Sequence, residues 1–343
     1  MPAGWRFSDL PIIQAPMAGG PSTPELTAAV SAAGGFGFVA GGYLSSSQLA
    51  AQITATRALS AAPFGVNLFC PSAPTAEPEL VASYAQAIEP EATRLRTTLG
   101  EPTWDGDGFS EKLSLVCDEA VDVVSFTFGC PRAHEVDELH RAGASVAVTV
   151  TSSAEARFAD ERGADLLVVQ GTEAGGHQGS FLELSANETP LPWLLEEIGA
   201  SVSLPLIASG GIMTGAATRA ALARGAIAVA LGTAFLCADE AGTSTLHREV
   251  LLRRTYEETV VTRAFSGRYA RGLRNEFAAR YGALAPEAYP ELHHLTRPLR
   301  AAATEAGDPT IPSFWAGEGW QAVSSEPASQ IVARLAAELA EGS

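Results

Sequence analysis

The chain has 343 residues, a formal charge of −17 from 39 acidic and 22 basic residues, and a hydrophobic fraction of 46%. This length suits one large α/β barrel or two domains, and the apolar content is ample for a core, which argues against a disordered chain. The strong negative charge argues against nucleic acid or an anionic membrane surface as a partner.

The four cysteines lie far apart in the sequence and form no C-x-x-C pair. We therefore expect neither a disulfide framework nor a metal site, and a reducing compartment fits. The first residues, MPAGWRFSDL, lack the basic segment and apolar stretch of a secretory signal, and the longest apolar-rich run, 226–238, is too short to span a bilayer. The sequence predicts a soluble cytoplasmic protein, either a monomer or a homodimer.

Apolar segments typical of buried strands begin near residues 11, 36, 64, 121, 145, 164, 204 and 226. Helix signals separate them, such as the Ser22-Thr23-Pro24-Glu25 start. Predicted helices cover 24–34, 45–59, 78–99, 110–120, 132–142, 152–162, 192–198 and 214–224. Eight strand–helix units in roughly 235 residues are typical of a closed (β/α)₈ TIM barrel. An open doubly wound sheet is the alternative, but it would more often place its phosphate-binding glycines after the first strand.

Residues 237–323 do not continue the strand–helix alternation, so we predict a mostly helical region that covers the barrel mouth. The amphipathic segment 327–339 is predicted to return as the helix after strand eight. The expected organisation is therefore a TIM barrel made of 1–236 and 324–343, with an accessory region at 237–323.

Glycine-rich turns follow the last two predicted strands, as Ser209-Gly210-Gly211 and Leu231-Gly232-Thr233. Barrel enzymes place their active sites at the carboxyl ends of the strands, and a phosphate often sits between the loops after strands seven and eight. Backbone amides at such turns suit an anion, so these two turns predict a phosphate site. Ordinary tight turns are the alternative interpretation.

The loop after strand six, within ADLLVVQGTEAGGHQGS, carries Gly175, Gly176 and His177. Paired glycines let the backbone pass close to a flat ligand because no Cβ is in the way. An imidazole among them is a candidate acid or base, since its ordinary pKa lies near neutrality. A solvent-facing loop histidine is the alternative. The helical His134 and His140 and the tail His293 and His294 are interpreted as surface or lid residues.

Three further strand ends suggest a large flat ligand. Small and apolar residues at Ala15 to Ala18, including Met17, would pack against a ring, while Asn67 and Gln170 offer amide groups from otherwise apolar strands. A buried amide needs a partner, which is either a ligand or neighbouring backbone.

The runs IIQAPMAGGPSTPELTAAVSAAGGFGF, GVNLF, VVQGTEAGGHQGSF, LIASGGI and LGTAFL resemble the nitronate monooxygenases, formerly called 2-nitropropane dioxygenases. The tail runs TRAFSGRYARGLRNEF and FWAGEG resemble the class I branch of that family. The resemblance extends from about residue 11 to 319 and is weak over 71–119. It implies an FMN-dependent barrel that oxidises alkyl nitronates, such as propionate 3-nitronate, with O₂ to a carbonyl product and nitrite or nitrate.

The resemblance also implies roles for individual residues. His177 matches the family's catalytic histidine, and Ala15 and Met17 would line the flavin ring. The remaining residues expected to bind FMN are Asn67, Gln170, Gly175, Gly176, Gly210, Gly211, Ala230, Leu231, Gly232 and Thr233. The pattern does not choose which tail residues close the pocket; Tyr269, Arg271 and Trp315 are candidates.

Other functions on the same scaffold remain open. An FMN-dependent NAD(P)H oxidoreductase acting on an enoyl-thioester or a quinone would use the same kind of barrel and loop histidine. A non-catalytic FMN-binding protein would keep the cradle without turnover. A flavin-free lyase is the weakest alternative, because no Schiff-base lysine or metal-binding carboxylates stand at the strand ends.

Overall fold

The computed structural model describes residues 7–182 and 185–341. Its centre is a sheet of eight parallel strands in the order β1-β9-β8-β6-β5-β4-β3-β2. β1 and β2 are the two ends of this order. Hydrogen bonds from Gln14 N to Phe36 O (2.9 Å) and from Phe36 N to Ile12 O (2.9 Å) join β1 to the residue before β2 and close the barrel. The strands are β1 (Ile12–Gln14), β2 (Gly37–Ala40), β3 (Phe64–Phe69), β4 (Val123–Thr127), β5 (Ser145–Val150), β6 (Leu166–Gln170), β8 (Leu206–Ser209) and β9 (Ala226–Leu231).

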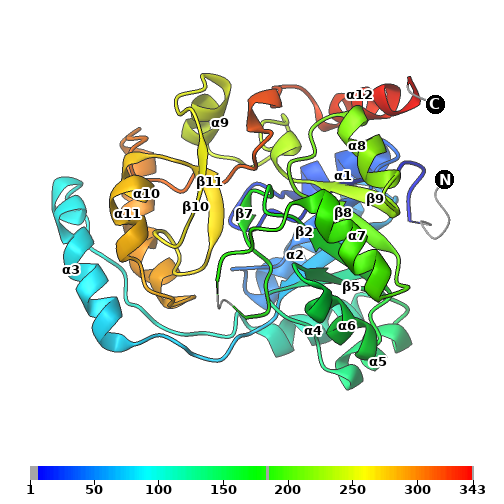
Figure 1. Ribbon diagram of the computed structural model, residues 1–343, viewed down its shortest axis with the longest axis horizontal. Helices are drawn as coiled ribbons and strands as arrows, with labels where there is room; N and C mark the ends of the chain where they lie inside the picture. Colours follow the sequence, from blue (N-terminus) through cyan, green and yellow to red (C-terminus); the bar gives the residue numbers. More distant parts are fainter. Residues whose placement is uncertain (1–6, 183–184, 342–343) are drawn as a thin grey trace.

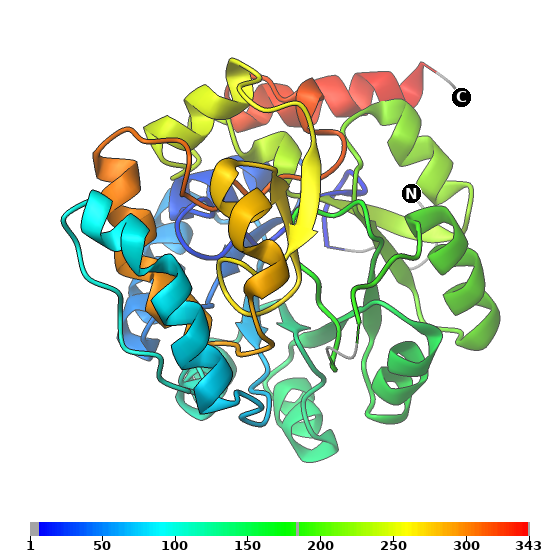
Figure 2. The same cartoon turned by 60° about the vertical axis from the view of Figure 1, so that its left-hand side comes forward.

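Helices surround the barrel, as Figures 1 and 2 show. They are α1 (Pro24–Ala32), α2 (Ser46–Leu59), α4 (Phe109–Asp118), α5 (Ala133–Arg141), α6 (Ser153–Glu161), α7 (Leu191–Ser201), α8 (Gly215–Leu222) and α12 (Ala328–Ala340). Side-chain caps start several of them: Thr23 accepts a hydrogen bond from Leu26 N, and Ser45 forms a capping box with Gln48. The eight predicted strands and the TIM-barrel fold class are confirmed.

The carboxy-terminal helix α12 completes the ring beside α8 and α1 (Figure 1). Gly215 N donates to the Glu338 carboxylate at 2.6 Å. A Cβ at Gly215 would lie 2.4 Å from the Cβ of Glu338, so only glycine lets the two helices approach this closely. The predicted return of the chain after the accessory region is therefore present.

Side chains along each strand point alternately into two hydrophobic layers. One layer, which includes Ile12, Val66 and Val148, packs between the strands and the surrounding helices. The other fills the barrel interior, where side chains from opposite strands meet; its buried members include Phe38, Ala147, Leu166, Ile207 and Ala228. Side chains thus fill the barrel interior, and a cavity lies at the carboxyl ends of the strands.

Outside the barrel lies a second hydrophobic cluster, built from α3 (Pro78–Arg94), α10 (Glu276–Tyr281) and α11 (Glu291–Glu305). Figures 1 and 2 both show α3 beside α11, although the two helices are far apart in the sequence. The region after strand eight also contains α9 (Thr245–Leu252) and a hairpin of β10 (Thr259–Thr262) and β11 (Ala270–Leu273). The expected mostly helical region therefore also contains strands, and the predicted domain limits stay a prediction.

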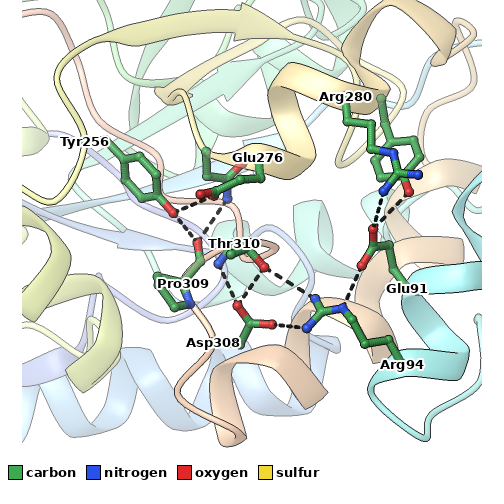
Figure 3. A network of polar contacts seen from close by, with 10 residues as sticks. Glu91, Arg94, Tyr256, Glu276, Arg280, Asp308, Pro309 and Thr310 are labelled. Carbon is green, nitrogen blue, oxygen red and sulfur yellow. Dashed lines mark hydrogen bonds and ion pairs between the residues drawn. The ribbon is translucent and has the colours of Figure 1, made fainter.

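Polar contacts link α3 to α10 and to the segment after α11 (Figure 3). Arg94 forms an ion pair with Asp308 at 2.7 Å. Glu91 of the same helix forms an ion pair with Arg280 at 3.2 Å and accepts a hydrogen bond from the Tyr281 hydroxyl at 3.0 Å. These contacts join a segment inserted between β3 and β4 to the region that follows β9.

Among the described residues, no helix is long and apolar enough to cross a membrane.

A buried ion pair supports the loop between β2 and α2. Lys112 is 1% exposed; its ammonium lies 2.7 Å from the Asp107 carboxylate and donates to Gly41 O at 2.9 Å. The other carboxylate oxygen of Asp107 accepts from Tyr43 N at 2.8 Å. Tyr43 has φ of 67°, a left-handed conformation that a tyrosine adopts only when its surroundings hold it. The pair therefore fixes the backbone at Tyr43.

We expect Lys112→Met to lower the free energy of unfolding by about 3–5 kcal/mol, because it leaves the Asp107 carboxylate buried without its partner. Urea unfolding at pH 7 measures this change. The double variant Lys112→Met/Asp107→Asn should recover part of the loss. Arg253→Met, which removes an exposed ion pair with Glu249, serves as the control and should change stability by less than about 1 kcal/mol. An equally small effect of Lys112→Met would contradict this account.

Candidate active site

The carboxyl ends of the barrel strands open into one cavity of about 730 Å³. Every residue that the sequence proposed for catalysis or for cofactor binding lines it. These residues are Ala15, Met17, Asn67, Gln170, Gly175, Gly176, His177, Gly210, Gly211, Ala230, Leu231, Gly232 and Thr233. The closed barrel explains this convergence, since the loops after all parallel strands meet at the same end.

Two glycine turns and a tail segment form one wall of the cavity. Gly210 and Gly211, after β8, have φ of 128° and 65°, so this turn needs residues without a Cβ. Thr233, after β9, accepts a hydrogen bond from Gly317 N at 2.9 Å. A Cβ at Gly175 would lie 2.4 Å from Gly317 N, so the loop after β6 also packs directly on this tail segment. The wall presents backbone amides and hydroxyl groups, a chemistry that suits an anion such as a phosphate.

The two candidate amides are used differently. The Asn67 amide nitrogen lies within hydrogen-bond distance of Ser125 Oγ (2.9 Å) and Thr127 Oγ1 (3.1 Å), which leaves its carbonyl oxygen for a ligand. Gln170 accepts from Gly179 N at 2.7 Å and donates to His177 O at 3.1 Å. Gln170 therefore holds the histidine loop in shape and retains one N–H for a ligand.

His177 belongs to a two-residue strand, β7 (Gly176–His177), which pairs antiparallel with β11. Its Nε2 lies 2.8 Å from the hydroxyl of Ser266, a residue that is 2% exposed. The rings of Trp315 and Tyr289 lie 5.3 and 5.7 Å away between centroids. Burial, together with nearby arginines, lowers the pKa of His177 to about 3. The imidazole is therefore neutral at pH 7.

His293, which the sequence suggested as a surface or lid residue, lies in the cavity wall. Its ring stacks on Tyr43, with centroids 4.2 Å apart and planes at 2°. Its neighbour His294 instead bonds Asp105 at 2.7 Å and does not line the cavity. Adjacent residues on a helix point in different directions, so the pair of histidines in the sequence could not show which one faces inward.

Of the three tail candidates, Trp315 lines the cavity, whereas Tyr269 and Arg271 do not. The Arg271 guanidinium donates to Thr172 O at 2.8 Å and so stabilises the loop after β6. Sequence reasoning missed Ser266 and Arg300. Ser266 lies within the run TRAFSGRYARGLRNEF, but nothing in that run distinguishes it from its neighbours.

A cationic group lies on the α11 side of the cavity. Arg300 donates to Thr296 Oγ1 (3.1 Å), Ser313 Oγ (3.2 Å) and His293 O (3.2 Å), all neutral acceptors. Burial lowers the pKa of this guanidinium to about 10, so it stays charged at pH 7. Within the described residues, Arg300 forms no ion pair with a carboxylate. A partly buried cation without an anionic partner favours an anionic ligand.

Three histidines of the cavity should make the ligand-free protein sensitive to acid. Burial is the largest cause that lowers the pKa of His177 to about 3, of His247 to about 4 and of His293 to about 2. Below pH 6.5 the unfolded chain binds more protons at these positions than the folded protein, so the free energy of unfolding falls as the pH drops. This loss begins near pH 6.5 and continues until the pH reaches the folded pKa values of about 4 to 2.

We expect His293→Gln to show a smaller decrease in unfolding free energy between pH 7 and pH 4.5 than the unaltered protein, measured by urea titration at both values. His134→Gln, on the exposed side of α5, is the control and should keep the full decrease. An identical decrease in all three proteins would show that His293 takes up its proton equally easily in both states.

The comparisons with known proteins agree with this geometry. The family model described as nitronate monooxygenase matches residues 3–338. A probable nitronate monooxygenase of Staphylococcus saprophyticus is 37% identical over 316 residues, which cover 90% of this chain and 88% of the relative. The nitroalkane oxidase structure from Streptomyces ansochromogenes has a TM-score of 0.95 at 44% identity, covering 98% of this chain and 97% of that one. FabK from Thermotoga maritima has a TM-score of 0.76 at 28% identity, covering 98% and 94%.

These matches span almost the whole chain, and the residues of the cavity lie within them. They make the protein an oxidoreductase, and the chain belongs to the nitronate monooxygenase family.

Proposed function

We propose that this protein is an FMN-dependent nitronate monooxygenase that oxidises alkyl nitronates with O₂ to a carbonyl product and nitrite or nitrate. The observation that carries the proposal is a single cavity that joins the amide-lined turns of β8 and β9 to the neutral His177. Family membership supports the reaction class.

The residues present fit FMN. The cavity volume of about 730 Å³ lies in the range of cofactor sites. The turns at Gly210–Gly211 and Gly232–Thr233 would hold the phosphate, Ala15 to Met17 would pack against the ring, and Asn67 would bind a polar edge of the ring. Bound FMN would supply the chemistry, by taking electrons from the substrate and passing them to O₂.

His177 would act directly on the substrate. A nitronate is already deprotonated at its carbon, so it needs no base, and a ring N–H of His177 would stabilise its negative charge. A neutral nitroalkane first loses a proton, for which the neutral imidazole is a suitable base. The Ser266 hydroxyl at 2.8 Å from Nε2 would orient the ring in both cases.

The arginine side of the cavity favours a nitronate with a second negative charge. Arg300 is a partly buried cation that contacts only neutral acceptors, and Arg297 also lines the cavity. A carboxylate would compensate this charge, which supports propionate 3-nitronate over simple alkyl nitronates as the substrate. The overall charge of −17 would repel such an anion, so the local positive charge has to offset it.

A first test separates this function from its closest alternative. An FMN-dependent NAD(P)H oxidoreductase stays the second candidate, because the same barrel and loop histidine would serve it. The purified protein should show a flavin absorption spectrum and consume O₂ with propionate 3-nitronate. Rapid anaerobic bleaching of the flavin by NADH, without nitronate-dependent O₂ consumption, would favour the reductase.

We expect His177→Asn to lower turnover of nitroethane by roughly 10²–10⁴-fold, the usual contribution of a general base, and turnover of ethyl nitronate far less. Steady-state O₂ consumption with both substrates measures the difference, and the flavin spectrum checks that FMN stays bound. Equal losses on the two substrates would exclude proton abstraction by His177.

We expect Arg300→Met to lower kcat/KM for propionate 3-nitronate by roughly 10- to 100-fold, because a charge-assisted hydrogen bond contributes about 1.5–3 kcal/mol. Ethyl nitronate, which has no carboxylate, should change by less than about threefold. Arg253→Met, which removes an exposed arginine directly after α9, is the control for a general loss of positive charge. Parallel losses on both substrates would contradict a carboxylate site at Arg300.

A further inference from the structure

The two roles proposed for His177 make opposite demands on one ring. A base has to offer a bare nitrogen to a nitroalkane, whereas stabilisation of a nitronate requires an N–H group. A neutral imidazole has one nitrogen of each kind, and the hydrogen bond that one nitrogen makes sets whether the other carries the proton. The contacts of His177 therefore decide which role the ring can perform.

Only one of the two ring nitrogens is open to the cavity. Nε2 lies 2.8 Å from Ser266 Oγ, and Ser266 is 2% exposed, so this nitrogen faces the protein interior. Nδ1 forms no hydrogen bond within the described part of the chain, and it is not among the fully buried side-chain atoms that lack a partner there. Because His177 lines the cavity and is half-buried, Nδ1 is the ring nitrogen that meets the substrate.

The backbone keeps the ring in this orientation. His177 pairs with Ala270 in the contact between β7 and β11, and Gln178 N donates to Tyr269 O at 2.8 Å. The segment that carries Ser266 is thus joined to the strand that carries the histidine. A rotation of the ring by a half-turn would bring a carbon to the Ser266 hydroxyl in place of Nε2, so the hydrogen bond selects one orientation.

The Ser266 hydroxyl has two acceptors within reach. Its oxygen lies 2.8 Å from Nε2 of His177 and 3.3 Å from the carbonyl oxygen of Arg268, and it also accepts from Arg268 N at 3.4 Å. A hydroxyl that donates to Arg268 O leaves its oxygen free to accept from an Nε2–H group. A hydroxyl that donates to Nε2 requires this nitrogen to be bare, and the ring proton is then on Nδ1.

We propose that Ser266 is a positioning residue whose hydroxyl, by rotating between these two acceptors, lets His177 change its tautomer with the substrate. The inference rests on the proposed function, because it takes nitroalkanes and nitronates as the ligands of Nδ1. The two forms differ in the place of one proton, which Nε2 gives up to water and Nδ1 takes up from it. The ring stays neutral in both.

The ligand-free protein rests in the base form. When Nε2–H donates to Ser266 and the hydroxyl donates to Arg268 O, both protons of the cluster have acceptors and the lone pair of Nδ1 faces the cavity. A nitroalkane gives its α-proton to this lone pair, the electron pair of the C–H bond stays on the substrate as the nitronate charge, and the imidazolium holds that anion through Nδ1–H. A nitronate that arrives from solution selects the other tautomer, because its charge needs a donor at Nδ1.

NMR of the holoprotein tests the proposal directly. All six histidines are labelled with ¹⁵N, whose chemical shift separates protonated from bare ring nitrogens, and comparison with His177→Asn assigns the signals of His177. We expect the proton on Nε2 without ligand and on Nδ1 after titration with nitrite, a planar anion that the proposed reaction releases. The exposed His134 should keep its signals. A proton on Nδ1 without ligand, or on Nε2 throughout the titration, would overturn the proposal.

Variants of Ser266 separate this role from simple packing. Ser266→Ala removes the hydroxyl, so neither tautomer has a partner at Nε2; we expect both tautomers without ligand and a roughly tenfold loss of kcat with nitroethane and with ethyl nitronate. Ser266→Thr keeps the hydroxyl and should keep a single tautomer and most of the activity. Thr304→Val, which removes a hydroxyl from the α11 side of the cavity, is the control and should change neither.

Circular dichroism checks that each variant is folded. If Ser266→Ala kept the single tautomer of the unaltered protein, the hydroxyl would not select it, and the assignment would fail. The tautomers are measured without turnover, so the two proposals can fail separately. The expected tautomers in a protein that consumes no O₂ with nitronates would refute the proposed function and not the role of Ser266 toward His177.

Discussion

The pairing of β7 with β11 is the contact on which the site depends. His177 and Gly176 come from the barrel loop after β6, whereas Ala270 and Arg271 come from the region after β9. Two residue pairs are enough to place the imidazole against Ser266, and Gln170 holds the same loop from the barrel side. The histidine is therefore positioned by two parts of the chain at once. Its geometry does not exist in the barrel alone.

The same enclosure sets the electrostatics of the cavity. Removing water from His177, His247 and His293 keeps these rings neutral, and removing it from Arg300 leaves a cation whose charge neutral acceptors do not compensate. A protein with a formal charge of −17 thus holds positive charge where a small anion would bind. Burial, rather than the composition of the chain, determines the chemistry available at this point.

The sequence allowed the barrel to be predicted because eight apolar runs typical of buried parallel strands alternate with helix signals over roughly 235 residues. The glycine turns and His177 were predictable for a related reason, since their places after β6, β8 and β9 follow from counting strands. The strand β7 was missed because two residues carry no periodic pattern. In β10 the residues TVVT are β-branched, a weak signal that the surrounding helical segments obscured.

Contacts between remote segments were not predictable for a different reason. The apolar face of α3 is visible in the sequence, but amphipathicity indicates that a helix is covered and not which element covers it. Likewise, the sequence could not distinguish His293, which stacks on Tyr43, from His294, which bonds Asp105. Ser266 and Arg300 could not be identified either, because only the fold brings Ser266 to His177 and Arg300 to the cavity.

The attachment of α3 has a consequence for exchanging parts between related enzymes. Arg94 and Asp308 form an ion pair although 214 positions separate them, and the buried Tyr84 donates to Ala264 O at 2.6 Å across a similar span. The cluster of α3, α10 and α11 is thus encoded in two separate parts of the chain. A chimera that exchanges only the later segment would leave α3 facing a foreign surface, with its apolar residues and Glu91 unmatched. The two segments have to be transplanted together.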